Sequence, residues 1–301
     1  MINGAGLISS QDISRKQLLQ FLKNLNQPFQ PSIKIKNQRN PVGLLAFFEV
    51  STRTRVSFEA AGLELGIKWI HLDSASLSLQ KGESYRDTFK TLAEYRPDFI
   101  ITRHSQSGFP FFLQDWAKVP VINAGDGLRD HPTQGLLDAA VVASLSKKPL
   151  KIGFFGDLAR SRVLRSDIYF LRMLGHNLHA VSDKSIESEM MLKAYQLKNL
   201  SRENLKSMDL IICSRVQTER GSEALQKPLD ISDIGAKTWI MHSGPVIAGQ
   251  DMTLDLFRNL DSVFAPKGIS KRNLILKQVA TGLEVRKRLL YELCQKKGLF
   301  S

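Results

Sequence analysis

Short apolar runs alternate with amphipathic stretches along most of the chain. In the first half, apolar runs predict strands at residues 44–48, 67–72, 99–102 and 119–122. The periodic stretches around them predict helices at residues 13–25, 55–66, 85–95 and 133–145. Strands that alternate with helices are typical of a parallel sheet covered by helices.

The same alternation starts again after Leu150. Strands are predicted at residues 151–155, 178–181, 210–213 and 238–242, and a long closing helix is predicted at 276–294. The fold class is therefore α/β, with two domains that each hold a parallel sheet flanked by helices. We expect domains at residues 1–135 and 136–301, with the closing helix packed back on the first domain.

Polar side chains follow many of the predicted strands. In parallel α/β sheets, ligands bind outside the carboxyl ends of the strands, so these positions are candidates for function. Each set lies shortly after a predicted strand: Ser51, Thr52, Arg53 and Thr54; Arg103; His131 and Gln134; Arg162; and Arg215 with Gln217. The cations among them indicate a small ligand with several negative charges.

Residues 51–54 open a predicted helix directly after a strand. Free backbone N–H groups, hydroxyls and Arg53 then converge on one point, which favours a phosphate. The alternative is an ordinary N-cap followed by a surface arginine. The chain has neither a Walker run nor the Rossmann spacing, so ATP and NAD are not expected. We predict no cofactor, no metal site and no covalent intermediate.

The composition of the chain gives its net charge and indicates its cellular location. The 301 residues carry 42 Lys and Arg against 29 Asp and Glu, a net charge of +13, which fits nucleic acid or anionic small substrates. The basic residues are dispersed and the phenylalanines lie in apolar runs, which disfavours nucleic acid. Cys213 and Cys294 are expected to be buried and reduced. Without a membrane-spanning run or a signal-like start, we expect a cytoplasmic protein.

Residues 47–55, Phe-Phe-Glu-Val-Ser-Thr-Arg-Thr-Arg, resemble the carbamoyl phosphate signature of the transcarbamoylase family. Further motifs are similar to the aspartate branch of that family: residues 81–84, 103–104, 123–134 and 215–220. The resemblance implies carbamoyl transfer from carbamoyl phosphate to the α-amino group of L-aspartate, a step of pyrimidine biosynthesis. It also implies a carbamoyl phosphate domain, an aspartate domain and an active site in the crevice between them.

The resemblance assigns roles to the strand-end residues. Those implied to bind carbamoyl phosphate are Ser51, Thr52, Arg53, Thr54, Arg103, His131 and Gln134. Thr54, Arg103 and His131 would polarise the carbonyl group, and Gln134 would hold the carbamoyl amine. Those implied to bind aspartate are Arg162, Arg215, Gln217 and Lys81.

The family also implies a homotrimer with shared active sites. Lys81 and Ser78, or Ser76 in place of Ser78, would enter the site of the neighbouring subunit. Glu49 would approach Arg162 and Arg220 when the domains close. A regulatory chain or a partner enzyme of the pathway is left open; membrane and nucleic acid are not expected as partners.

Three segments depart from the family pattern. Ser243 replaces a proline, residues 246–248 lack an arginine, and Thr281-Gly282 replaces Asn-Gly. Loss of the proline predicts a less rigid loop. Two alternative functions remain: a non-catalytic paralogue that acts as a scaffold in a pathway complex, and a carbamoyltransferase for another amino acid.

Overall fold

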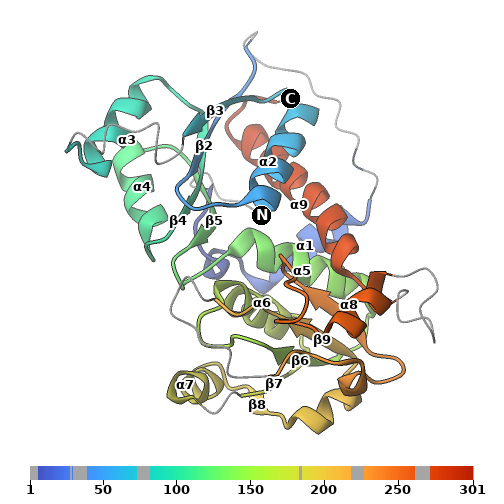
Figure 1. Cartoon of the computed structure of the whole chain (residues 1–301). Helices are drawn as coiled ribbons and strands as arrows, with labels where there is room; N and C mark the ends of the chain where they lie inside the picture. Colours follow the sequence, from blue (N-terminus) through green and yellow to red (C-terminus); the bar gives the residue numbers. More distant parts are fainter. Residues whose placement is uncertain are drawn as a thin grey trace. The chain divides into compact units, whose positions relative to one another are not determined.

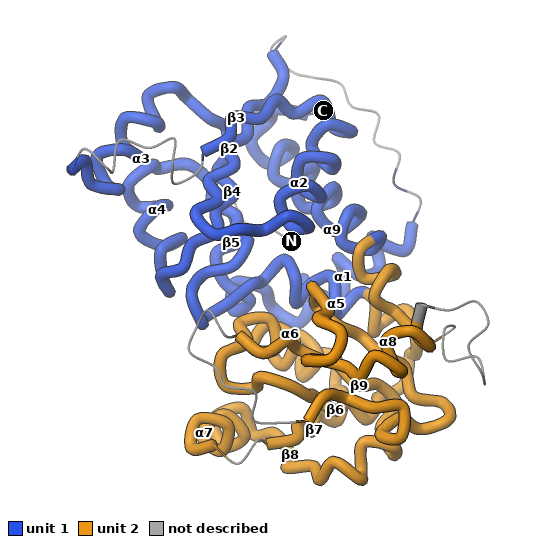
Figure 2. Tube along the Cα trace, in the orientation of Figure 1, with its two compact units in different colours: residues 1–140, 280–301 blue, residues 141–279 orange. Residues whose placement is uncertain are grey.

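The chain divides into two compact units, shown in different colours in Figure 2. The computed structural model describes residues 6–27, 29, 39–72, 82–182, 185–217, 227–261 and 272–300. The first unit comprises Met1–Ala140 and Ala280–Ser301, and the second comprises Val141–Val279. The division lies inside helix α5 (Pro132–Leu145), and the predicted division at 135/136 lies in the same helix. Because α5 runs on without interruption, the sequence carries no linker signal at this point.

The first unit is built on a parallel sheet. Its strands are β1 (Gly6–Leu7), β2 (Val42–Phe47), β3 (Lys68–Leu72), β4 (Phe99–His104) and β5 (Val121–Asp126). Their order among the described residues is β1-β5-β4-β2-β3. The predicted strands are present, but β4 and β5 extend further, so Arg103 and residues 123–126 belong to strands. The two-residue β1 was not predicted, because it is too short to show a pattern.

Helices cover this sheet. They are α1 (Arg15–Leu25), α2 (Thr52–Glu64), α3 (Tyr85–Glu94), α4 (Phe109–Ala117) and α9 (Ile275–Lys296), besides α5. Figure 1 shows α3 and α4 on one side of the sheet and α2 and α9 on the other. On the α3–α4 side, Phe89 and Phe109 pack against Leu44 and Ile100. The helix predicted to start at residue 55 begins three residues earlier, at Thr52.

Trp69 fills a gap between β2 and α2. A Cβ atom added at either Gly43 or Gly62 would overlap the Trp69 ring. The indole Nε1 donates a hydrogen bond to the carbonyl oxygen of Glu59 at 3.2 Å. These two glycines therefore provide the space in which the indole ring packs.

The second unit has its own parallel sheet. Its strands are β6 (Lys151–Phe155), β7 (Asn177–Ala180), β8 (Lys198–Asn199), β9 (Leu210–Cys213) and β10 (Trp239–His242). Their order among the described residues is β10-β9-β6-β7-β8. The accompanying helices are α6 (Arg162–Met173), α7 (Ile186–Ala194) and α8 (Leu254–Asp261). The exposed edge strand β8 was not predicted, because Lys198 and Asn199 lack apolar character.

The core of this unit lies against β9 and β10. It includes Leu205, Ile211, Ile240 and Leu256, all fully buried.

The described residues also contain short 3-10 helices: η1 (Ser10–Asp12), η4 (Arg202–Ser207) and η6 (Ile231–Asp233). Cys213 and Cys294 are buried and free, as predicted. Within the described ranges, every helix is too short or too polar to cross a membrane.

Candidate functional site

The ends of three neighbouring strands bring the predicted site residues of the first unit together. In sheet order, β5 is followed by β4 and β2, and all three run parallel. Residues 51–54 follow β2, Arg103 is the penultimate residue of β4, and His131 follows β5. The carboxyl ends of parallel strands meet at one edge of the sheet, so these groups share that edge.

The N-terminus of α2 lacks the side-chain cap that begins other helices. Ser14 and Ser84 each accept a hydrogen bond from a backbone N–H of the helix they precede. Ser51 occupies the corresponding position before α2 but makes no side-chain cap hydrogen bond. The first turn of α2 also has no acidic residue. The start of α2 therefore has no ordinary serine cap. The backbone N–H groups of its first turn can instead bind an anion.

Arg103 is held by its neighbours at the end of β4. Its Nη1 donates to the carbonyl oxygen of Ala124 at 3.4 Å, and its Nε lies 3.3 Å from Oε2 of Glu49. The two charged side chains are 17% and 19% exposed, respectively. Glu49 therefore forms an ion pair inside its own unit, and its approach to Arg162 and Arg220 on domain closure stays a prediction.

His131 lies in a buried loop immediately before α5. Only 3% of its surface is exposed, and its Nδ1 lies 3.4 Å from Oγ1 of Thr133. The preceding residue, Asp130, accepts hydrogen bonds from Ser9 Oγ at 3.0 Å, Ser10 N at 2.7 Å and Ser10 Oγ at 2.7 Å. The N-terminal segment thus fixes the loop that carries His131.

Gln134 lies in the first turn of α5. Its Nε2 donates to the two carboxylate oxygens of Asp138 at 3.3 and 3.2 Å. Asp138 is fully buried one turn further along the helix. This contact holds the Gln134 amide in a defined orientation.

His104 closes β4 beside Arg103 and stacks on Phe109. The ring centroids are 3.9 Å apart and the interplanar angle is 6°. The backbone N–H of Gln106 donates to Nδ1 of His104 at 2.9 Å. Burial lowers the pKa of His104, while the charge of Glu49 acts in the opposite direction. The lowered pKa favours a neutral ring at this position.

In the second unit, Arg162 and Arg215 follow two paired strands. β6 pairs with β9, and Arg162 begins the helix after β6, whereas Arg215 follows β9. Ser161 caps that helix by accepting a hydrogen bond from Leu164 N at 3.3 Å. Gly156 has a φ of +106°, and a Cβ there would overlap the carbonyl oxygen of Ser214. This glycine lets the two strand ends approach each other closely.

Two buried aspartates hold the loop around Arg215. Asp157 accepts from the backbone N–H of Gln217 at 3.1 Å. Asp251 accepts from Val216 N at 3.3 Å and Ile247 N at 2.7 Å. The Nε2 atom of His242 lies 3.5 Å from Oδ2 of Asp251. Asp251 therefore joins the Arg215 loop to the loop that contains Ser243.

The Ser243 loop carries hydrogen bonds of its own. Gly244 N donates to Nδ1 of His242 at 2.8 Å, next to a cis peptide bond between Gly244 and Pro245. Together with the bond from Ile247 N to Asp251, this contact ties both ends of the loop. Whether Ser243 makes the loop less rigid stays a prediction.

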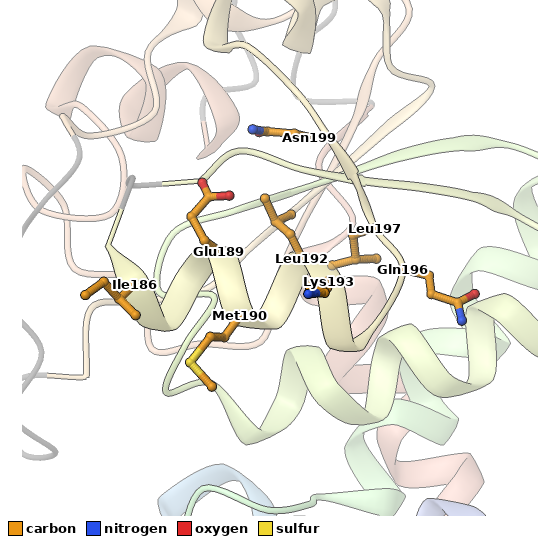
Figure 3. A pocket seen from close by; sticks show the side chains of 8 residues that line it. All are labelled: Ile186, Glu189, Met190, Leu192, Lys193, Gln196, Leu197 and Asn199. Atoms are coloured by element: carbon orange, nitrogen blue, oxygen red, sulfur yellow. The ribbon is translucent and has the colours of Figure 1, made fainter.

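Some predicted site residues lie outside the described residues: Ser76, Ser78, Lys81 and Arg220. Within the described ranges, His, Cys, Asp and Glu side chains form no group of three or more that could hold a metal ion. A pocket of about 670 Å³ lies at α7 and β8, lined by residues that include Ile186, Met190 and Asn199 (Figure 3). None of the predicted site residues lines it.

Sequence reasoning missed two residues that organise these sites. Asp138 follows Gln134 at the i,i+4 spacing of a helix, and that spacing could have revealed the contact. Asp251 reaches its partners only through tertiary packing, and no local spacing indicates it.

Two parallel sheets with cations at their carboxyl ends define a class: α/β proteins that bind small anionic ligands. A family model described as "Aspartate/ornithine carbamoyltransferase, carbamoyl-P binding domain" matches residues 6–144. An aspartate carbamoyltransferase catalytic subunit of Solibacter usitatus is 34% identical, over 95% of this chain and 98% of that protein. The corresponding subunit of Helicobacter pylori is 33% identical, over 94% and 96%.

Solved structures give the same assignment of fold. The catalytic subunit of M. jannaschii aspartate transcarbamoylase matches with a TM-score of 0.74 and 27% identity, over 98% of this chain and 99% of that one. Aspartate transcarbamoylase of Trypanosoma cruzi, in complex with carbamoyl phosphate and aspartate, matches with a TM-score of 0.78 and 21% identity over 97% of each chain. The chain belongs to the aspartate carbamoyltransferase family.

Proposed function

We propose that the chain is an aspartate carbamoyltransferase. It transfers the carbamoyl group of carbamoyl phosphate to the α-amino group of L-aspartate, which gives N-carbamoyl-L-aspartate and phosphate for pyrimidine biosynthesis. The observation that carries this proposal is the shared edge of β2, β4 and β5, which holds the start of α2, Arg103 and His131. Relatives with this name align with the chain over nearly their whole length, which supports the proposal.

The phosphate of carbamoyl phosphate binds at the start of α2. Backbone N–H groups, the hydroxyls of Ser51, Thr52 and Thr54, and the guanidinium of Arg53 all supply donors there. The partial positive charge of the helix terminus adds to their effect. A helix start without an acidic side chain or a side-chain cap supports this role.

The carbonyl group is polarised by Thr54, Arg103 and His131. As the amine attacks, negative charge develops on the carbonyl oxygen, and donors fixed in advance stabilise that charge. The contacts of Arg103 with Glu49 and Ala124 support such fixed geometry. Gln134 binds the carbamoyl NH₂ group.

The aspartate carboxylates bind to Arg162 and Arg215, assisted by Gln217. Guanidinium groups bind carboxylates with two parallel hydrogen bonds, which a lysine cannot reproduce. The placement of both arginines at the ends of paired strands supports this role.

The neutral α-amino group of aspartate attacks the carbonyl carbon of carbamoyl phosphate. A C–N bond forms, the bond between the carbonyl carbon and the phosphate oxygen breaks, and the amine proton is released.

The assembly is a cytoplasmic homotrimer in this proposal. Lys81 and Ser78 complete the neighbouring site, and Glu49 and Arg220 contribute to closure. Light scattering of the purified protein should then give three times the chain mass of 33.8 kDa. A monomer with full activity would contradict the shared site.

The first experiment is an assay of phosphate release from carbamoyl phosphate with aspartate, run in parallel with ornithine. We expect turnover with aspartate alone. Turnover with another amino acid would show that aspartate is not the only acceptor substrate, or not the acceptor at all. Binding of carbamoyl phosphate without turnover would favour the scaffold alternative.

A further inference from the structure

Half-buried Gln134 lies in the first unit together with two buried charged residues, Asp138 and Arg286. Gln134 and Asp138 lie one turn apart on α5, and Arg286 lies on α9. Asp138 is 0% exposed and Arg286 is 4% exposed. The Nε2 atom of Gln134 lies 3.3 and 3.2 Å from the two oxygens of Asp138.

This contact fixes which end of the Gln134 amide is available to a ligand. An ionised carboxylate only accepts hydrogen bonds, so the NH₂ group of Gln134 must face Asp138. The carbonyl oxygen Oε1 then points away from Asp138. This oxygen accepts hydrogen bonds, so it can bind a ligand group that donates one.

Arg286 is the second buried charge of this part of the first unit. Its guanidinium lies over the ring of Phe58, 5.2 Å from the centroid. Burial lowers the pKa of Arg286 to about 10, and the negative charge of Asp138 opposes that effect. The guanidinium therefore remains charged at neutral pH, opposite in sign to Asp138.

Gly282 leaves the space that Arg286 occupies. A Cβ atom at this position would lie 2.8 Å from Nη1 of Arg286 and 3.1 Å from Cδ2 of Leu137. Gly282 of α9 therefore packs beside both Arg286 and Leu137, the residue that precedes Asp138 on α5. Gly282 is also part of the Thr-Gly pair that departs from the family pattern.

We propose that Asp138, supported by Arg286, selects for acyl phosphates that carry an NH₂ group by holding Oε1 of Gln134 toward the ligand. Asp138 and Arg286 are positioning residues, and Gln134 is the group that touches the substrate. This inference rests on the proposed function, which places the carbamoyl amine at Gln134. It predicts discrimination against acetyl phosphate, which has a methyl group in place of the NH₂ group.

The test compares ligands that differ only at this group. Initial rates give the KM for carbamoyl phosphate, and competition gives the Ki values of acetyl phosphate and inorganic phosphate. In D138N the neighbouring amide both donates and accepts, so Gln134 is free to turn its own NH₂ toward the ligand. We expect the KM for carbamoyl phosphate to rise by roughly 10- to 100-fold, because two donors then face each other. Both Ki values should stay within about threefold.

Further variants separate the possible outcomes. The isosteric D115N removes an exposed carboxylate of α4 and should leave all three constants unchanged. Q134M removes the acceptor itself: a rise in KM with Q134M but not with D138N would overturn the inference and leave the proposed function intact. No change with Q134M would overturn both the inference and the placement of the carbamoyl group.

A paired variant covers the case in which D138N does not fold. D138N/R286Q removes both buried charges together, which avoids leaving one of them without its partner. It should show the same selective rise in KM for carbamoyl phosphate. An equal rise for all three ligands would indicate general disruption of the site and would overturn the inference.

Discussion

Nε of Arg103 lies 3.3 Å from Oε2 of Glu49, and both side chains are largely buried. The carboxylate orients the guanidinium and offsets part of its charge. Glu49→Gln keeps the shape but removes the negative charge. We expect phosphate to bind a few times more tightly and kcat to fall by roughly tenfold, because Arg103 is less well fixed. Steady-state kinetics with phosphate as inhibitor measure both effects, and an unchanged kcat would contradict this role of Glu49.

Arg215 is expected to determine the affinity for aspartate. Arg215→Lys keeps the positive charge but loses the forked geometry, so the KM for aspartate should rise by about 10- to 100-fold. Because Arg215 belongs to the second unit, inhibition by phosphate should not change. An unchanged KM for aspartate would remove Arg215 from the aspartate site.

Asp251 should act on aspartate binding through the loops that it joins. In Asp251→Asn a single side-chain oxygen must replace two carboxylate oxygens, which accept from Val216 and Ile247. We expect the KM for aspartate to rise by roughly tenfold and the free energy of unfolding to fall by about 1–3 kcal/mol. Asp255→Asn, at an exposed position of α8, is the matched control. Equal effects of the two substitutions on KM would argue against the loop role.

The lowered pKa of His104 makes the fold sensitive to acid. Burial keeps the ring neutral in the folded state, whereas the unfolded ring titrates near its ordinary pKa of 6.5. The stabilisation is therefore fully present above about pH 6.5 and is lost as the pH falls through the lower pKa of the folded state. Burial also lowers the pKa of His176, which adds to the same trend.

His104→Asn provides the comparison, because its side-chain oxygen can still accept the bond from Gln106 N. Urea unfolding at about pH 7 and pH 5 should show a smaller loss of stability in the variant than in the original protein. Equal losses would mean that His104 does not contribute to the acid sensitivity.

Both cysteines should be unreactive in the folded protein. Burial raises the pKa of Cys294 to about 12 and raises that of Cys213 as well. The thiolate is the reactive form, so almost none is available near pH 8. A colorimetric thiol reagent should detect 2 thiols per chain after denaturation and almost none before it. Rapid modification of the native protein would show that one of these segments opens.

Much of the fold could be predicted from the sequence, including the strand ends at which Arg103 and Arg215 lie. The apolar runs predicted the longer strands, because a buried parallel strand is apolar on both faces. The edge strand β8 and the two-residue β1 depend on pairing with their neighbours, so no local pattern marks them.

The contacts that hold the candidate site residues in place were harder to predict from the sequence. The ion pair of Arg103 with Glu49 and the loop contacts of Asp251 join residues from separate strand ends or loops. Their geometry follows from the register of the sheets, which hydrophobic periodicity does not determine. The division between the units lies within a continuous helix, so no local pattern marks the residue at which it falls.

Trp69, Gly43 and Gly62 limit how this sequence can change. While the indole ring is present, neither glycine can gain a methyl group without displacing it. Once the tryptophan is replaced by a smaller residue, the vacated volume would accept alanine at Gly62, whereas at Gly43 the ring of Phe99, 2.7 Å from the added Cβ, would also have to move. Substitutions among related chains should therefore occur here as a coordinated set, with the tryptophan changing before the glycines do.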